Sequence, residues 1–284
     1  MTLDLDHLRS WIGREETADD TVTLTPVRAL SATLDREEPA ILEGDALPPL
    51  WHWLYFLPLQ RQSEIGLDGH AKRGGFLPPI PLPRRMWAGG RFQFHRPLRI
   101  GDVIRRTSRI VDITRKDGRS GPLIFVLVRH DIRNADGTAI VEEHDIVYRD
   151  FAQPGEASPP HRLAPAGATW LRSIHPDDVL LFRYSALLFN AYRIHYDRRY
   201  VTEVEGYPGL IVHAPLVATL LADLVRRNST AAMTAFRFKA VLPLFDTSDF
   251  AVCGVPSPDG HKVVLWAQNG STHLAMEAEA ILAT

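Results

Sequence analysis

The chain has 284 residues, of which 45% are hydrophobic and 23% are charged, a composition typical of folded globular proteins. The formal net charge of −2 argues against a nucleic-acid partner, and the single cysteine excludes an intrachain disulfide and a cysteine-rich zinc site. The N-terminal residues do not resemble a secretory signal, and no run approaches the ~20 apolar residues of a membrane span. We therefore expect a soluble, cytoplasmic protein without a membrane partner.

A proline-rich stretch divides the chain into two parts of similar size. Residues 152–169 contain four prolines and no apolar period, which is typical of an extended linker. We expect one domain over residues 1–151, a linker over 152–169 and a second domain over 170–284.

The residue pattern of the first part predicts one helix followed by three strands. Its helix candidate is mostly apolar and spans Leu50–Ile65, with Pro58 as a point of kinking. Turn signals such as Asp117-Gly118 separate the strand candidates, which are Val103–Ile113, Leu123–Ile132 and Ala139–Tyr148.

The second part repeats this order. Leu210–Arg227 predicts a helix, with Pro215 in its first turn and Asn228 at its end. The helix is apolar on nearly every face, which indicates burial inside a wrapping sheet. The strand candidates that follow are Phe250–Val255, Lys262–Gln268 and His273–Leu282.

A short internal match supports a duplication. Phe92-x-Phe94 precedes Asp102 with the same spacing by which Phe236-x-Phe238 precedes Asp246. Such a repeat indicates one supersecondary unit used twice. We expect an α+β fold of two units, each a long central helix wrapped by a curved antiparallel sheet, which together form a pseudo-dimer.

The segment Phe182–Leu224 resembles the signature of MaoC-like (R)-specific enoyl-CoA hydratases. It is most similar to the branch with mesaconyl-C4-CoA hydratases and mitochondrial-type 3-hydroxyacyl-thioester dehydratases, and Met86–Ile104 resembles the N-terminal domain of the same proteins. The resemblance implies a double hot-dog fold and a hydro-lyase that hydrates an enoyl thioester or dehydrates a 3-hydroxyacyl thioester. The first half has no counterpart of the motif FNAYRIH, so we expect one active site per chain, with the first half shaping the acyl pocket.

The resemblance also implies the site residues. His195 occupies the motif's histidine position, whereas its aspartate, asparagine and proline positions hold Asn190, Tyr192 and Arg193. His195 would then be the acid and base, because an imidazole titrates near neutral pH, and Asn190 would orient the water without ionising. Ala214, in the family's glycine position at the start of the buried helix, would stabilise the thioester oxygen through its N–H group.

Other residues of this segment are candidates for the substrate pocket. Tyr192 and Tyr196 are expected as pocket walls. Arg193, Arg199 and the neighbouring Arg198 suit the phosphates of coenzyme A or a substrate carboxylate, and surface exposure explains them nearly as well. The histidines show no metal-ligand spacing, so we expect neither a metal nor another cofactor.

Several functions remain open at this stage. The substrate is expected to be a short acyl-CoA, with a C4–C5 dicarboxyl group such as mesaconyl favoured slightly by the arginines, and an acyl-ACP of fatty-acid synthesis is the alternative. A hot-dog thioesterase would need a carboxylate, for which Glu203 and Glu205 are candidates. The amide at Asn190 would also suit a non-catalytic acyl-CoA-binding protein. A homodimer of pseudo-dimers is a further expectation.

Overall fold

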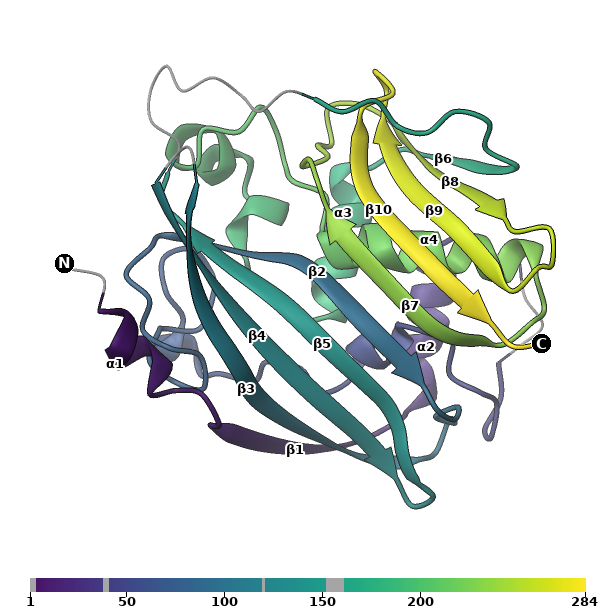
Figure 1. Cartoon of the computed structure of the whole chain (residues 1–284), viewed down its shortest axis with the longest axis horizontal. Helices are drawn as coiled ribbons and strands as arrows, with labels where there is room; N and C mark the ends of the chain where they lie inside the picture. Colours follow the sequence, from purple (N-terminus) through teal and green to yellow (C-terminus); the bar gives the residue numbers. More distant parts are fainter. Residues whose placement is uncertain (1–3, 38–40, 119–120, 152–160) are drawn as a thin grey trace.

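The fold is one continuous antiparallel sheet of ten strands that curves around the helices (Figure 1). The computed structural model describes residues 4–37, 41–118, 121–151 and 161–284. The strands lie in the order β1-β3-β4-β5-β2-β7-β10-β9-β8-β6. This order is symmetric about the β2–β7 pair, so the two halves of the chain build equivalent halves of the sheet, as the internal repeat predicted.

The elements of the two halves correspond one to one in the sheet. The first half contains β1 (Glu15–Thr21), β2 (Arg84–Phe94), β3 (Val103–Gly118), β4 (Gly121–Asn134) and β5 (Gly137–Arg149). The second contains β6 (Trp170–Ile174), β7 (Met233–Ala240), β8 (Phe250–Pro256), β9 (Lys262–Asn269) and β10 (Leu274–Leu282). The helices are α1 (Leu5–Arg9), α2 (Leu24–Thr33), α3 (Asp178–Leu187) and α4 (Ala214–Asn228), and the short helical turns are η1 (Trp51–Leu54), η2 (Gln62–Glu64), η3 (Arg193–His195) and η4 (Tyr200–Val204).

The repeated Phe-x-Phe sequences meet at the centre of the sheet. Phe92 of β2 is paired directly with Phe236 of β7 in the antiparallel ladder. The Phe92 ring also stacks on Phe238, with ring centroids 6.1 Å apart and planes 11° apart. The aromatic repeat therefore forms the joint between the two halves.

The central helix of the second half lies where the sequence predicted it. Pro215 lies in the first turn of α4, and every residue from Leu216 to Val225 is buried. The predicted helix nevertheless began four residues too early. The segment ahead of α4 is extended instead, because Val212 donates its N–H group to the Leu244 carbonyl at 2.9 Å.

The predicted first-half helix, Leu50–Ile65, is wrong. This stretch contains only the single turns η1 and η2, and Leu50 and Phe56 have positive φ angles of 69° and 56°, which interrupt a right-handed helix. The central helix of this half is α2, which the sequence analysis missed. Its buried Val27 and Leu30 lie three residues apart and face the core.

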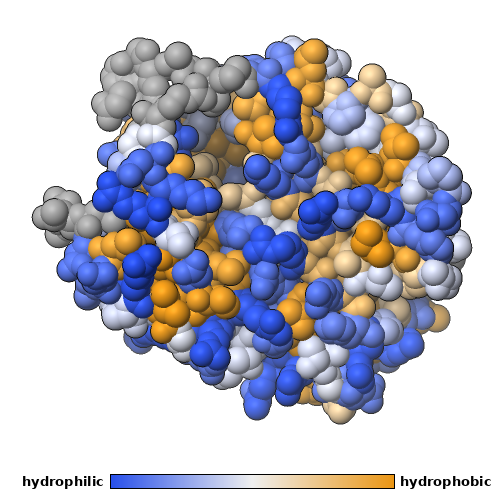
Figure 2. Space-filling model, viewed as in Figure 1, coloured by the Kyte–Doolittle hydropathy of each residue, from blue (hydrophilic) through white to orange (hydrophobic). Residues whose placement is uncertain are grey.

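The outer face of the sheet is polar. In Figure 2, hydrophilic side chains run across the strands with smaller hydrophobic areas between them. Arg91 illustrates this surface, because its exposed guanidinium pairs with Glu143 and Asp145, each at 2.7 Å. The buried apolar side chains form a core on the opposite face, whereas single residues such as Val103 and Val264 remain exposed.

The predicted linker is only partly within the described residues, since 152–160 lie outside them. Residues 161–169 follow the second half of the sheet: the Ala164 N–H group donates to Thr272, and the Thr169 N–H group donates to Gly254. No helix in the described part of the chain is long and apolar enough to cross a membrane.

Candidate active site

The candidate site lies on the segment that connects β6 to α4. Asp177 caps α3 through its side chain, which accepts from the Leu180 N–H group at 2.8 Å, and the helix ends at Leu187. Phe189 then adopts a left-handed φ of 49°, and η3 carries His195. Asn190 and His195 therefore lie on irregular backbone between α3 and α4.

His195 is buried and has a defined tautomer. His195 is only 7% exposed, and its Nδ1 lies 2.7 Å from the Ile211 carbonyl oxygen. Because a carbonyl oxygen only accepts, Nδ1 must carry the proton and Nε2 keeps a lone pair. Burial lowers the pKa of His195 to about 4, against the opposing effect of the Ile211 hydrogen bond. At neutral pH, His195 is therefore a neutral imidazole that can accept a proton at Nε2.

His195 lies directly at the entrance of the buried helix. Its ring stacks on that of His213, with centroids 3.7 Å apart and planes 19° apart. His213 is the N-cap residue of α4, and its Nε2 is 2.8 Å from Ser185 Oγ. The next residue, Ala214, has its N–H group in the first turn, where a helix offers donors without intrahelical acceptors and the positive end of its dipole. The fold therefore places a neutral imidazole beside the first turn of a buried helix.

Asn190 holds the turn that leads to His195. Its Oδ1 accepts the Tyr192 N–H group at 3.0 Å, and its own N–H group donates to the Ser185 carbonyl at 2.8 Å. The amide oxygen thus has a structural partner in the turn, and the residue is half-buried. An ionised aspartate in this position would lack the Nδ2 donor of the amide.

The two tyrosines have different environments. Tyr192 is buried, and its ring stands edge-on to His195 with centroids 5.6 Å apart. Burial raises the pKa of Tyr192, so its phenol stays protonated. Tyr196 is 45% exposed, and its hydroxyl group donates to the Ala191 carbonyl at 3.0 Å. Tyr192 is therefore the residue that lines the site beside His195.

The predicted arginines already have partners within the chain. Arg193 pairs with Asp197 at 2.7 Å, and Arg199 is largely exposed and pairs with Glu203 at 2.9 Å. Arg198 is ion-paired with Asp246. These contacts explain the arginines without a ligand.

A loop of the first half, which no sequence motif indicated, packs against this segment and completes the wall of the site. The Arg193 N–H group donates to the Asp68 carbonyl at 2.9 Å, and Gly69 packs so tightly that a Cβ there would lie 1.7 Å from the Ala191 oxygen. The His70 ring lies on Tyr192 with centroids 3.9 Å apart, and its Nδ1 is 2.9 Å from the Asp68 carboxylate. The imidazoles of His70 and His195 therefore flank the same tyrosine.

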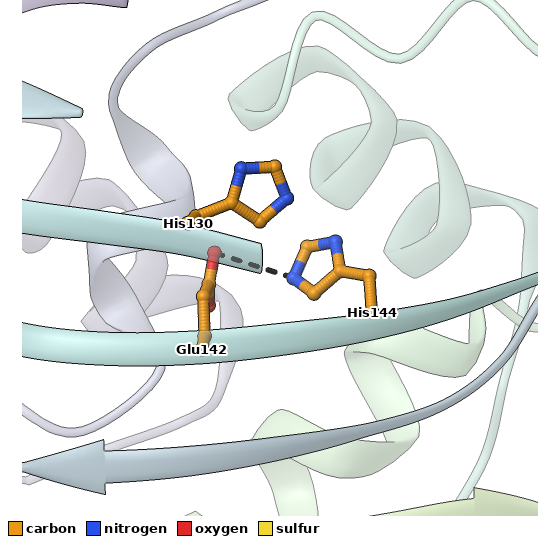
Figure 3. A group of neighbouring side chains, drawn as sticks. All are labelled: His130, Glu142 and His144. Carbon is orange, nitrogen blue, oxygen red and sulfur yellow. Dashed lines mark ion pairs between the residues drawn. The ribbon is translucent and has the colours of Figure 1, made fainter. Parts of the chain in front are cut away.

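A second group of ionisable residues lies inside the first half (Figure 3). The fold brings His130 of β4 and Glu142 and His144 of β5 together, with one ligand atom of each within 4.8 Å of the others. Among the described residues, this is the arrangement that could hold a metal ion, although the sequence spacing had indicated none. The Glu142 carboxylate already has nearby donors, with His52 Nε2 at 2.8 Å and Trp53 Nε1 at 3.2 Å, besides His144 Nε2 at 3.2 Å. Burial alone would raise the pKa of Glu142, but its histidine neighbours hold that pKa well below the usual value.

Comparison with known proteins places the chain in a family. Residues 50–246 match the hydroxyacyl-thioester dehydratase type 2 family. A mesaconyl-C4-CoA hydratase of Chloroflexus aurantiacus is 48% identical over 95% of this chain and 96% of its own length. The chain belongs to the hydroxyacyl-thioester dehydratase type 2 family.

Solved structures support the fold. A MaoC-like dehydratase from Phytophthora capsici superimposes with a TM-score of 0.71 at 14% identity, covering 99% of both chains. A Mycobacterium tuberculosis protein described as a double hotdog fold covers 96% of both chains at 13% identity, with a TM-score of 0.56. The predicted MaoC-like double hot-dog fold is thus confirmed, and with the family it identifies the chain as a hydro-lyase.

The carboxylates considered for a thioesterase lie in other interactions. Glu205 is buried and pairs with Arg84 at 3.0 Å, and Glu203 is exposed and pairs with Arg199. The loop with Asp68 and His70 and the buried, neutral His195 are instead the features that surround Tyr192.

Proposed function

We propose that this protein reversibly hydrates a short dicarboxyl enoyl-CoA of the mesaconyl-C4-CoA type. The observation that carries the proposal is the neutral His195, whose Nε2 lone pair lies beside the first turn of α4. The similarity to the Chloroflexus hydratase supplies the substrate class.

The proposed mechanism uses His195 for both proton transfers. Nε2 accepts a proton from water, and the resulting hydroxide forms a C–O bond with the β-carbon of the enoyl group. The imidazolium then returns that proton to the α-carbon from the same face, which regenerates the neutral base. Negative charge that develops on the thioester oxygen is stabilised by the Ala214 N–H group and the helix dipole.

Asn190 and Tyr192 would act without changing their protonation. The Asn190 Nδ2 group can donate a hydrogen bond to the attacking water or to the product hydroxyl group. The buried Tyr192 ring shields His195 from bulk water, which keeps its pKa low. We also propose the division into residues 1–151, 152–169 and 170–284, with the one site in the last part and a wall from the first.

The test is a direct assay with purified protein and mesaconyl-C4-CoA. Loss of the absorbance of the conjugated thioester, without release of free thiol to a thiol reagent, supports hydration. Release of thiol instead would indicate a thioesterase, and tight binding with neither reaction would indicate a binding protein. The same assay with the acyl-ACP compares the two carriers, and prior dialysis against a chelator should leave turnover unchanged.

A further inference from the structure

Three ionisable side chains of the first half converge inside the fold (Figure 3). Glu142 and His144 are two residues apart on β5, so their side chains leave the same face of the sheet. His130 of β4 is paired directly with Glu142 in the antiparallel ladder, which brings its side chain next to the other two. One ligand atom of each residue lies within 4.8 Å of the others, so the strand register itself assembles the group.

The two oxygen atoms of Glu142 have different environments. Oε2 lies 2.8 Å from His52 Nε2 and accepts from Trp53 Nε1 at 3.2 Å. Oε1 lies 3.2 Å from His144 Nε2, yet this buried nitrogen has no hydrogen-bond partner within the described part of the chain. The nitrogen and Oε1 are therefore close to each other without the geometry of a hydrogen bond. Ion pairing satisfies Oε2 and leaves the His144 nitrogen without a partner, which a native structure rarely tolerates.

The surrounding residues hold the imidazoles in place from outside the group. His130 Nδ1 lies 2.8 Å from Ser108 Oγ, which can accept the Nδ1 proton and leave the lone pair of Nε2 free. The His144 ring lies against Trp87, with centroids 4.0 Å apart. A metal-bound histidine is usually held in this way through its other nitrogen, and a ligating carboxylate is usually hydrogen-bonded as well. Ser108 and the donors to Glu142 Oε2 therefore correspond to the outer contacts of a metal site.

The donor set and its spacing suit a zinc-like ion. Two imidazole nitrogens and one carboxylate oxygen are typical zinc ligands, whereas Ca²⁺ and Mg²⁺ prefer oxygen alone. With bonds of ~2.0–2.2 Å, neighbouring ligand atoms of a tetrahedral ion are roughly 3.4 Å apart. The 3.2 Å between His144 Nε2 and Glu142 Oε1 is close to this value. The widest separation of 4.8 Å exceeds it by roughly 1.4 Å, which rotation of the side chains around the ion would close.

We propose that His130, Glu142 and His144 bind one divalent transition-metal ion, for which Zn²⁺ is the best fit. The ion satisfies the unpartnered His144 nitrogen and Glu142 Oε1 together, and three protein ligands leave its fourth position to water. It joins β4 to β5 inside the first half, whereas the proposed base belongs to the second half. The site is therefore independent of the proposed hydration, and its test does not use turnover.

The experiment measures Zn²⁺ binding by the full chain. The purified protein is stripped with a chelator, dialysed, and titrated with Zn²⁺ alone in competition with a chromogenic chelator. Co²⁺ is then used in place of Zn²⁺, because four-coordinate Co²⁺ absorbs visible light far more strongly than six-coordinate Co²⁺. The ligand variants are His130→Gln, Glu142→Gln and His144→Gln. The control is His273→Gln, which removes one ring of another histidine pair, His161 and His273, whose centroids are 4.7 Å apart.

We expect one equivalent of Zn²⁺ per chain with a Kd below about 10 μM, and a four-coordinate Co²⁺ spectrum. Each ligand variant should bind at least about 100-fold more weakly, because the loss of an outer contact alone costs ~10–100-fold in affinity. The affinity of His273→Gln should stay within about threefold of the wild type. Zn²⁺ at ~100 times its Kd should raise the wild-type Tm by about 5 °C or more and leave that of His144→Gln unchanged.

A wild-type Kd above about 10 μM, a six-coordinate Co²⁺ spectrum, or an affinity that the ligand variants leave unchanged would overturn the site. Loss of binding in His273→Gln alone would place the ion on the other histidine pair and overturn it too. If the ligand variants do not fold, Ser108→Ala decides, because it removes only the outer contact of His130 Nδ1. Its affinity for Zn²⁺ should fall by about 10–100-fold, and an unchanged affinity would refute the site.

Discussion

Replacing His195 by glutamine tests the centre of the proposed mechanism. Neither glutamate considered for a thioesterase is free to share the proton transfers, since Glu205 pairs with Arg84 and Glu203 with Arg199, and the motif's acidic position is Asn190. A positioned acid or base contributes typically ~10²–10⁴ in rate. Because one imidazole serves both transfers here, we expect His195→Gln to lower kcat by about 10³-fold.

The assay follows loss of the conjugated thioester at saturating substrate. His175→Gln is the matched control, because His175 lies in the same half, has a side chain that is 74% exposed, and pairs with Asp249 at the surface. This control should retain wild-type turnover within about twofold. A folded His195→Gln protein with more than about a tenth of wild-type turnover would refute the reasoning, because another group would then be moving the protons.

Four further outcomes follow from the structure. In the proposed mechanism the neutral form of His195 is active, and its pKa is about 4, so kcat/KM should stay level from pH 8 to pH 5 and fall only near pH 4. A drop in kcat/KM near pH ~6.5, the ordinary pKa of histidine, would contradict the lowering of this pKa by burial. Because the pKa of His195 is lower in the folded protein than in the unfolded chain, the neutral imidazole stabilises the fold fully above pH ~6.5, and this contribution is lost as the pH falls to about 4. In denaturant titrations the wild-type unfolding free energy should therefore fall by about 3 kcal/mol over this pH range. His195→Gln should lack this pH dependence. Gly69→Ala should lower the unfolding free energy by about 1–3 kcal/mol and reduce turnover, while Gly75→Ala, where a Cβ meets nothing within 4 Å, should do neither. Glu142→Gln should lower the free energy of unfolding, measured by thermal unfolding, by about 3–5 kcal/mol, because it removes a buried charge that interacts with neighbouring histidines. The control Glu143→Gln, at the adjacent and partly exposed residue, should lower it by less than ~1 kcal/mol.

Local sequence was sufficient where local chemistry determines the structure. The apolar faces and Pro215 located α4, and the motif FNAYRIH coincides with the irregular segment that carries His195. The first-half helix was missed for an opposite reason. The apolar run after Leu50 is longer and more hydrophobic than α2, yet left-handed residues at Leu50 and Phe56 break it, and no sequence pattern showed that its aromatics would fill the space beside a short helix.

The first-half contribution to the site could not be read from the sequence. Arg193 and Leu67 are bonded at a separation of 126 residues, and no local periodicity encodes such a contact. Asp68 and His70 also carry no motif, and they gain their position only because Gly69 allows the loop to approach the Ala191 backbone. The ionisable cluster around Glu142 is hidden in the same way, since His130 meets it through pairing of neighbouring strands.

The place where each half inserts extra chain accounts for the single site that we propose for the duplicated fold. In the first half only Val22 and Thr23 separate β1 from α2, so no segment can overhang the start of that helix. In the second half residues 175–213 fill the equivalent position and bring the base to the start of α4. The first half inserts its extra chain after its helix instead, over residues 34–83, and this insertion supplies the loop that packs against Tyr192.

The interior of the first half is correspondingly free to be polar. Glu142 is paired with Phe92 in the ladder, and the residue paired with the equivalent Phe236 is Ala280, which is fully buried in an apolar core. The fold therefore does not require an ionised carboxylate at this position. The buried carboxylate is instead matched by groups of the first half's own interior, His52, Trp53 and His144, so this polar cluster is a property that the first half has acquired and the second half lacks.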